Sequence, residues 1–173
     1  NYSAKKIDSE VNMKSLRLDI NNKETDVAIL KIEGNFPAVE LGDSTLLDSG
    51  DRLTAIGFPG IVDGGINTKK EKTVPTITQG NLQQTVLDGG GHKLFLMSTM
   101  IASGNSGGPA FDSKGKQVGI NTYGGAACED GKKGNSCFGK GIARDISDLK
   151  AMAKKNNVAI SADGELTKLW KDG

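Results

Sequence analysis

Short runs of β-branched and apolar residues alternate with glycine-containing turns along most of this 173-residue chain. Strands of this length at near-regular spacing favour an antiparallel barrel or sandwich over parallel βαβ units, which need a helical pattern between the strands. The turns contain Gly60, Gly64-Gly65, Gly89-Gly90-Gly91 and Gly124-Gly125. We therefore predict strands over 16–20, 27–32, 52–57, 73–79, 93–99, 108–111, 117–122 and 141–143.

Helical periodicity is confined to the end of the chain. Apolar residues recur at helical spacing after two capping residues, Asp145 and Ser147, and the pattern ends at Asn156-Asn157. The apolar positions are Ile146, Leu149, Met152 and Ala153. Residues 164–170 resemble the start of a second helix just before the sequence ends, which leads us to expect a longer native polypeptide.

The composition excludes several classes of protein. Hydrophobic residues make up 36% and charged residues 25%, with 24 glycines, as in a turn-rich globular domain. The net charge of +1 gives no concentrated basic face, so we expect no nucleic-acid partner. No apolar run approaches the roughly 18 residues that a membrane-spanning helix needs, and these 173 residues show no signal-peptide pattern.

Two cysteines, Cys128 and Cys137, bracket a polar loop. At this separation they can close a disulfide, and we favour that state over two free thiols. A metal site is a poor alternative, because two thiols and one distant histidine do not supply four ligands. A disulfide would place the protein outside the cytoplasm.

The stretch GNSGGP at 104–109 surrounds Ser106 with almost no side chains. A serine hydroxyl becomes a useful nucleophile when a base takes its proton and donors hold the developing oxyanion. Small neighbours let a substrate carbonyl approach the backbone, and Gly104 can turn its N–H beside that of Ser106. The alternative is that this stretch is only a tight turn between two strands.

Four further motifs accompany this loop in a fixed order. They are TDVAILKI at 25–32, LGDS at 41–44 with Gly50-Asp51 following, AIGFPG at 55–60 and VGINT at 118–122. Together with GNSGGP they resemble the trypsin-like serine proteases of the chymotrypsin fold. The bacterial branch that includes the high-temperature-requirement proteases is the most similar, and the resemblance runs from about residue 14 to residue 156.

The resemblance implies an all-β fold of two antiparallel β-barrels followed by a C-terminal α-helix, with the first barrel incomplete. The corresponding division is a remainder of the N-terminal barrel at 1–50, the C-terminal barrel with the nucleophile loop at 51–145, and the helix with the start of a following segment at 146–173.

The resemblance also implies roles for individual residues. Ser106 would be the nucleophile, and the loop residues Gly104, Asn105 and Ser106 would form the oxyanion hole. Asp26 would orient a histidine, although a solvent-facing carboxylate at a strand entry is the alternative. The substrate side chain would lie against Met100, Ile101, Ala102, Ser103, Thr122, Tyr123 and Gly124.

No acidic residue is present among these substrate-binding positions, so we predict a preference for small or medium apolar side chains. Met100 and Ile101 can equally be plain barrel core. The strand that ends at 122–124 could pair with the substrate backbone by strand addition.

The expected catalytic histidine is missing from its place before Asp26. The chain holds one histidine, His92, in the glycine-rich stretch 89–93, and we predict it to be a loop residue. Either the chain is a fragment whose missing strands carry the histidine, which we favour, or it descends from proteases and only binds. Removal of early strands would leave unpaired edges, which leaves open a homo-oligomer or a strand-swapped dimer.

The sequence thus predicts a serine endopeptidase domain that cleaves peptide or protein substrates through an acyl-enzyme and is nearly inactive as this chain alone. The alternative is a catalytically inactive peptide-binding or scaffolding domain. No metal or organic cofactor is implied. We expect an extracytoplasmic location, whether secreted, periplasmic or membrane-anchored, and leave open a further C-terminal domain.

Overall fold

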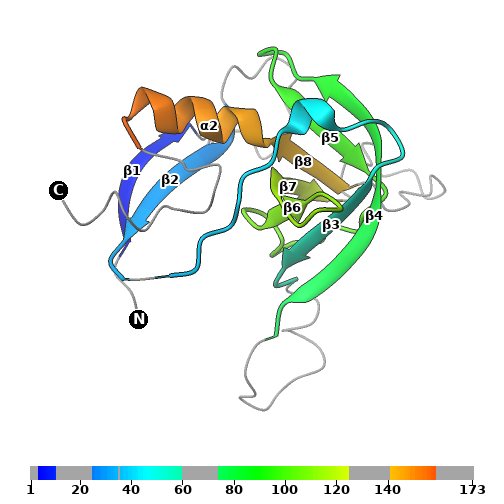
Figure 1. Ribbon diagram of the computed structural model, residues 1–173, viewed down its shortest axis with the longest axis horizontal. Coiled ribbons are helices and arrows are strands. Elements are labelled where there is room, and N and C mark those ends of the chain that lie inside the picture. Colours follow the sequence, from blue (N-terminus) through cyan, green and yellow to red (C-terminus); the bar gives the residue numbers. More distant parts are fainter. Residues whose placement is uncertain (1–3, 11–24, 35, 60–73, 125–140, 159–173) are drawn as a thin grey trace, which may run out of the picture.

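The computed structural model describes residues 4–10, 25–34, 36–59, 74–124 and 141–158 (Figure 1). Nearly all the regular structure in these ranges is β-strand, with one 3-10 turn and one α-helix. The elements are β1 (Ala4–Glu10), β2 (Val27–Ile32), η1 (Ser44–Leu46), β3 (Arg52–Gly57), β4 (Thr76–Leu87), β5 (Lys93–Met97), β6 (Pro109–Phe111), β7 (Gln117–Gly124), β8 (Gly141–Asp145) and α2 (Ile146–Lys155).

Six strands form a closed antiparallel barrel in the order β3-β4-β5-β8-β7-β6, and β3 pairs with β6 to complete the circle. The residues that point inward are apolar and almost fully buried, including Leu53, Phe95, Met97 and Val118. Closure leaves no strand edge of this sheet unpaired. The predicted all-β class with a C-terminal helix is therefore confirmed.

The two remaining strands, β1 and β2, form a separate antiparallel sheet beside the barrel, with α2 lying across it (Figure 1). One face of β2 is open, since Leu30 and Ile32 are 59% and 43% exposed. A two-stranded sheet is marginal without a packing partner, and α2 supplies one. The domain boundaries at 50/51 and 145/146 stay predictions.

The connection between the two sheets runs along the barrel surface. Gln117 N–H donates to Glu40 O at 2.9 Å and Gly42 N–H donates to Gln117 O at 2.8 Å, so this segment pairs briefly in parallel with the start of β7. Asp43 then accepts from the N–H and hydroxyl of Thr45 and begins η1.

Most predicted strands agree with the structure, and the differences have local causes. The strand predicted at 73–79 corresponds to β4, which begins at Thr76 and continues to Leu87. Gly80 does not end the strand, because it lies within β4 where the backbone closely approaches Ser98 and Thr99. β1 was not among the predicted strands, since its sequence is largely polar. α2 matches its predicted span, with Asp145 as its cap. The strand predicted at 16–20 and the helix predicted at 164–170 lie outside the described residues.

Gly80 is required by the close approach of β4 to the Ser98-Thr99 backbone. A Cβ at this position would lie 2.4 Å from Thr99 N and 2.7 Å from Ser98 C, and backbone atoms cannot move aside cheaply. Gly80→Ala should lower the free energy of unfolding by about 1–3 kcal/mol, the usual cost of overpacking. Urea denaturation measures this effect. Gln79→Ala, at an exposed neighbouring position, is the control. Equal stability of the two variants would contradict the close approach of Gly80 to the Ser98-Thr99 backbone.

Candidate active site

The loop that carries Ser106 is shaped by two glycines with left-handed backbone, Gly104 at φ +100° and Gly107 at φ +83°. Asn105 N–H donates to Ala102 O at 3.0 Å and Gly107 N–H to Asn121 O at 2.8 Å. Within the described part of the chain, the N–H groups of Gly104 and Ser106 donate to no backbone carbonyl. These two donors are therefore available to a bound group.

Asn105 anchors this loop to the end of β3. Its side chain is only 3% exposed and lies against the Cα of Gly57. A Cβ on Gly57 would come within 2.6 Å of the Asn105 Oδ1 and 2.9 Å of its Cα. The Asn105 Oδ1 has no hydrogen-bond partner among the described residues. The contact therefore fixes the loop by shape and not by a hydrogen bond.

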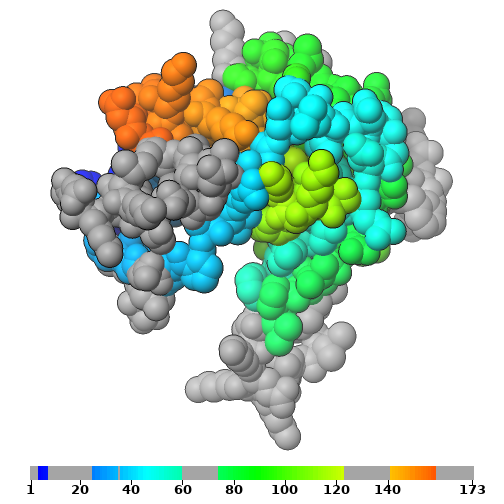
Figure 2. Space-filling view, viewed as in Figure 1, coloured from blue at the N-terminus to red at the C-terminus, as the bar shows by residue number. Residues whose placement is uncertain are grey.

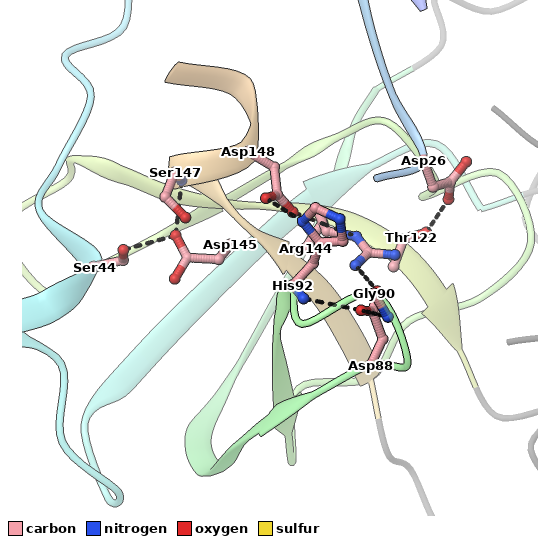
Figure 3. Close-up of polar contacts among 10 residues, drawn as sticks. All are labelled: Asp26, Ser44, Asp88, Gly90, His92, Thr122, Arg144, Asp145, Ser147 and Asp148. Carbon is pink, nitrogen blue, oxygen red and sulfur yellow. Dashed lines mark hydrogen bonds and ion pairs between the residues drawn. The ribbon is translucent and has the colours of Figure 1, made fainter. Parts of the chain in front are cut away.

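Thr122, near the end of β7, links Ser106 to Asp26. The exposed Ser106 hydroxyl donates to Thr122 O at 3.1 Å. The Thr122 hydroxyl donates a short hydrogen bond to the Asp26 carboxylate (Figure 3). Two residues that are 80 positions apart in the sequence are thus joined through one intervening residue.

Asp26, which contacts Thr122, has a strained backbone conformation. Its φ of +52° lies in the left-handed region that a non-glycine residue rarely adopts. Thr25 and Val27 on either side are 6% and 2% exposed, so buried neighbours fix the conformation while the carboxylate stays at the surface. Strain of this kind, when the surroundings enforce it, is concentrated at functional positions.

The predicted substrate-binding residues differ in their surroundings. Met100 is 65% exposed, and its carbonyl accepts from the Thr78 hydroxyl at 2.8 Å. Ile101 is buried with the barrel core, Ala102 and Thr122 are half-buried, and Ser103 is exposed. Tyr123 and Gly124 are the last residues of β7, where they pair with Ile142 and Gly141 of β8. Cys128 and Cys137 lie outside the described residues.

His92 lies in the turn between β4 and β5, as predicted, and its ring faces α2. Its Nδ1 lies 3.0 Å from Asp148 Oδ1 (Figure 3). The structure thus places the histidine of this chain with Asp148, and it places Asp26 with Thr122.

The bridging role of the Thr122 hydroxyl was not foreseen, because Thr122 and Asp26 are 96 residues apart. No local pattern reports such a contact. Within the described ranges, no cluster of His, Cys, Asp and Glu could hold a metal ion. The same ranges contain no helix with the length and apolar character needed to cross a membrane.

Comparison with known proteins gives consistent matches. The profile of the trypsin-like peptidase domain family matches residues 3–120. A probable periplasmic serine endoprotease, DegP-like, from Pseudomonas putida (strain GB-1) is 43% identical over 103 residues, which are 57% of this chain and 19% of the relative. A protein of the same description from Bartonella henselae is 33% identical over 120 residues, 66% of this chain and 21% of the relative.

Among solved structures, the HtrA-type protease AlgW with decapeptide superposes with a TM-score of 0.63 at 27% identity, covering 89% of this chain and 40% of that one. The chain spans about a fifth of the length of the curated relatives it matches. The family profile covers most of the chain, and both the relatives and the solved structure are proteases of one type. The chain therefore belongs to the trypsin-like peptidase domain family, in its HtrA-type branch.

Proposed function

We propose that this chain is the greater part of the catalytic domain of a serine endopeptidase, with Ser106 as the nucleophile and Asp26 as the carboxylate that orients the general base. The observation that carries this proposal is the Thr122 bridge, whose carbonyl accepts from Ser106 and whose hydroxyl donates to Asp26. A catalytic carboxylate and nucleophile must flank one imidazole, and contacts of both residues with the same Thr122 support that arrangement.

The proposed reaction is acyl transfer. The Ser106 Oγ attacks the peptide carbonyl carbon, and its proton passes to the base. The N–H groups of Gly104 and Ser106, in the loop anchored by Asn105, stabilise the oxyanion. The C–N bond then breaks as the base returns the proton to the leaving amine, and water hydrolyses the acyl-enzyme.

The imidazole that this reaction needs is not His92, because that ring is bonded to Asp148 in the β4–β5 turn. We assign the base to a part of the native protein outside these 173 residues. The large share of each relative that this chain does not cover is consistent with this assignment.

The proposed substrates are peptides or proteins with a small or medium apolar side chain before the cleaved bond. Residues 100–103 and 122–124 carry no charged side chain, which supports this preference. The solved neighbour is named with a decapeptide and the relatives are named periplasmic. We therefore also propose peptide binding and an extracytoplasmic location. A homo-oligomer, a strand-swapped dimer, a further C-terminal domain and the Cys128–Cys137 disulfide stay predictions.

The first test is reaction of the native full-length protein with a fluorophosphonate, read by intact mass. We expect one adduct, because an activated serine reacts while ordinary serines do not. Ser106→Ala should abolish the adduct, and Ser103→Ala, at an exposed position three residues earlier, should not abolish it. If the folded native protein forms no adduct, the proposed protease activity is refuted. A catalytically inactive peptide-binding domain is then the remaining function.

The Thr122 hydroxyl gives a second test in the same protein. Thr122→Val removes the donor to Asp26 and keeps the side-chain shape. A hydrogen bond to a charged group contributes about 1.5–3 kcal/mol, so we expect kcat/KM for a peptide substrate to fall roughly 10- to 100-fold. Thr122→Ser restores a hydroxyl and should retain most activity. Equal activity of the two variants would show that the bridge plays no part in the reaction.

The side-chain preference is tested with a peptide series that varies only the residue before the cleaved bond. We expect kcat/KM for valine or alanine to exceed that for arginine by at least about tenfold, because a guanidinium would lose water without gaining a carboxylate partner. A preference for arginine or lysine would contradict the assignment of residues 100–103 and 122–124 to the substrate pocket.

A further inference from the structure

Four charged or titratable side chains that are not part of the Thr122 bridge form a cluster at the first turn of α2 (Figure 3). Asp88 and His92 come from the β4–β5 turn, Arg144 from β8 and Asp148 from α2. Arg144 Nη1 donates to Asp88 Oδ2 at 2.5 Å, and both side chains are about 5% exposed. His92 Nδ1 lies 3.0 Å from Asp148 Oδ1. The β4–β5 turn, β8 and α2 therefore meet in one polar network, in which the side chains of Asp88 and Arg144 are buried and those of His92 and Asp148 are partly buried.

The pKa values of the two carboxylates in this network, Asp88 and Asp148, shift in opposite directions. Burial raises the pKa of Asp88, but hydrogen bonds from Arg144 and from the N–H groups of His92 and Gly90 bring it below its usual value. Burial raises the pKa of Asp148, and the favourable contributions of His92 and Arg144 do not offset it, while Asp145 adds repulsion. Arg144 Nε and Asp148 Oδ2 face each other at 3.9 Å without a hydrogen bond.

The raised pKa of Asp148 has a definite consequence for stability. Because the folded protein holds the proton more tightly than the unfolded chain, ionised Asp148 lowers stability above its folded pKa, and this cost disappears as the pH falls through that value. Ionisation of Asp148 therefore does not itself stabilise the fold. A buried ionic group of this kind can instead specify one geometry.

α2 is the element whose geometry matters here. It begins directly after β8, and its cap Asp145 accepts from the Ser44 hydroxyl and from Ser147 N–H, both at 2.7 Å. Lys150 Nζ donates to Gly42 O at 2.7 Å. In addition to these hydrogen bonds, α2 packs against β2, β7 and β8. In Figure 1 it reaches from the barrel to the β1–β2 sheet, and Figure 2 shows its barrel end against residues near η1.

The position of Asp26 depends on this helix. Asp26 immediately precedes β2, whose sheet has two strands and cannot fix its own position. α2 packs against β2, and Val27 of β2 and Met152 and Ala153 of α2 are all at most 3% exposed, so both elements carry buried apolar residues. A change in the angle of α2 on the barrel would therefore move Asp26 relative to Thr122.

We propose that Asp148, held by His92, is a positioning residue that sets α2 on the barrel and through α2 keeps Asp26 in register with Thr122 and Ser106. The mechanical part of this proposal is that Asp148 sets the position of α2 and of β2, and it is argued from the contacts alone. The catalytic part, that this position affects the reaction, rests on the proposed function. A displacement of about 1 Å in a catalytic group can cost about 10²-fold in rate.

The mechanical part is tested by amide hydrogen exchange of the native full-length protein carrying Asp148→Leu. Arg144 keeps its partner Asp88 in this variant, so the barrel should remain folded. We expect the amides of Val27–Ile32 to exchange at least tenfold faster, while those of Arg52–Gly57 exchange as before. Ala151→Leu adds the same side chain at an exposed position of α2 and should change neither set. Unchanged exchange in Val27–Ile32 would overturn the proposal.

A second pair of variants separates geometry from charge. Asp148→Asn keeps an oxygen that accepts from His92 and removes the charge, so it should restore slow exchange in Val27–Ile32. Fast exchange with Asn would overturn the geometric role. His92→Leu removes the other partner and should reproduce the effect of Asp148→Leu, which keeps the proposal testable if Asp148→Leu fails to fold.

The catalytic part is read from the steady-state kinetics of peptide cleavage in the same proteins. Asp148→Leu should lower kcat roughly 10- to 100-fold with KM nearly unchanged, because the proposed substrate-binding residues belong to the barrel. Faster exchange with unchanged kcat would overturn the link to catalysis. An inactive parent protein would instead refute the proposed function, and the exchange result would still decide the mechanical role.

Discussion

The pairing of β3 with both β4 and β6 closes the barrel, and the position of Ser106 depends on that closure. β6 follows directly after the loop that carries Ser106, so its pairing with β3 brings Asn105 onto Gly57 at the end of β3. The absence of a side chain at Gly57 permits this contact. Because the loop is fixed at both ends by barrel backbone, Gly104 and Ser106 can hold N–H groups that donate to no backbone carbonyl of the described residues.

Asp26 reaches the same place by a different physical route. It belongs to a small sheet outside the barrel and meets β7 through the Thr122 hydroxyl, while α2 spans the two sheets. The barrel thus carries Ser106 and Gly104, the proposed nucleophile and oxyanion donor, and the separate two-stranded sheet carries Asp26, the proposed catalytic carboxylate. Residues that set the angle between these units, such as Asp148, can therefore influence the site without touching it.

Much of this fold could be predicted from the sequence because its signals are local. Clustered apolar and β-branched residues give β2 and β3, and the Asp145 cap with its apolar periodicity gives α2. Two features did not follow from local pattern. β1 has a polar sequence, so its strand conformation comes from pairing with β2, and β4 passes through Gly80 because Ser98 and Thr99 lie against it.

The sequence by itself determined the family, the strand class, and the loop in which glycines surround Ser106, because each depends on residue types at short separation. Only the tertiary structure decided which distant residues meet. It joined Asp26 to Ser106 through Thr122, and it placed His92 with Asp148 at the base of α2. These contacts span from 16 to 96 residues and follow from barrel closure and helix packing, which no local pattern encodes.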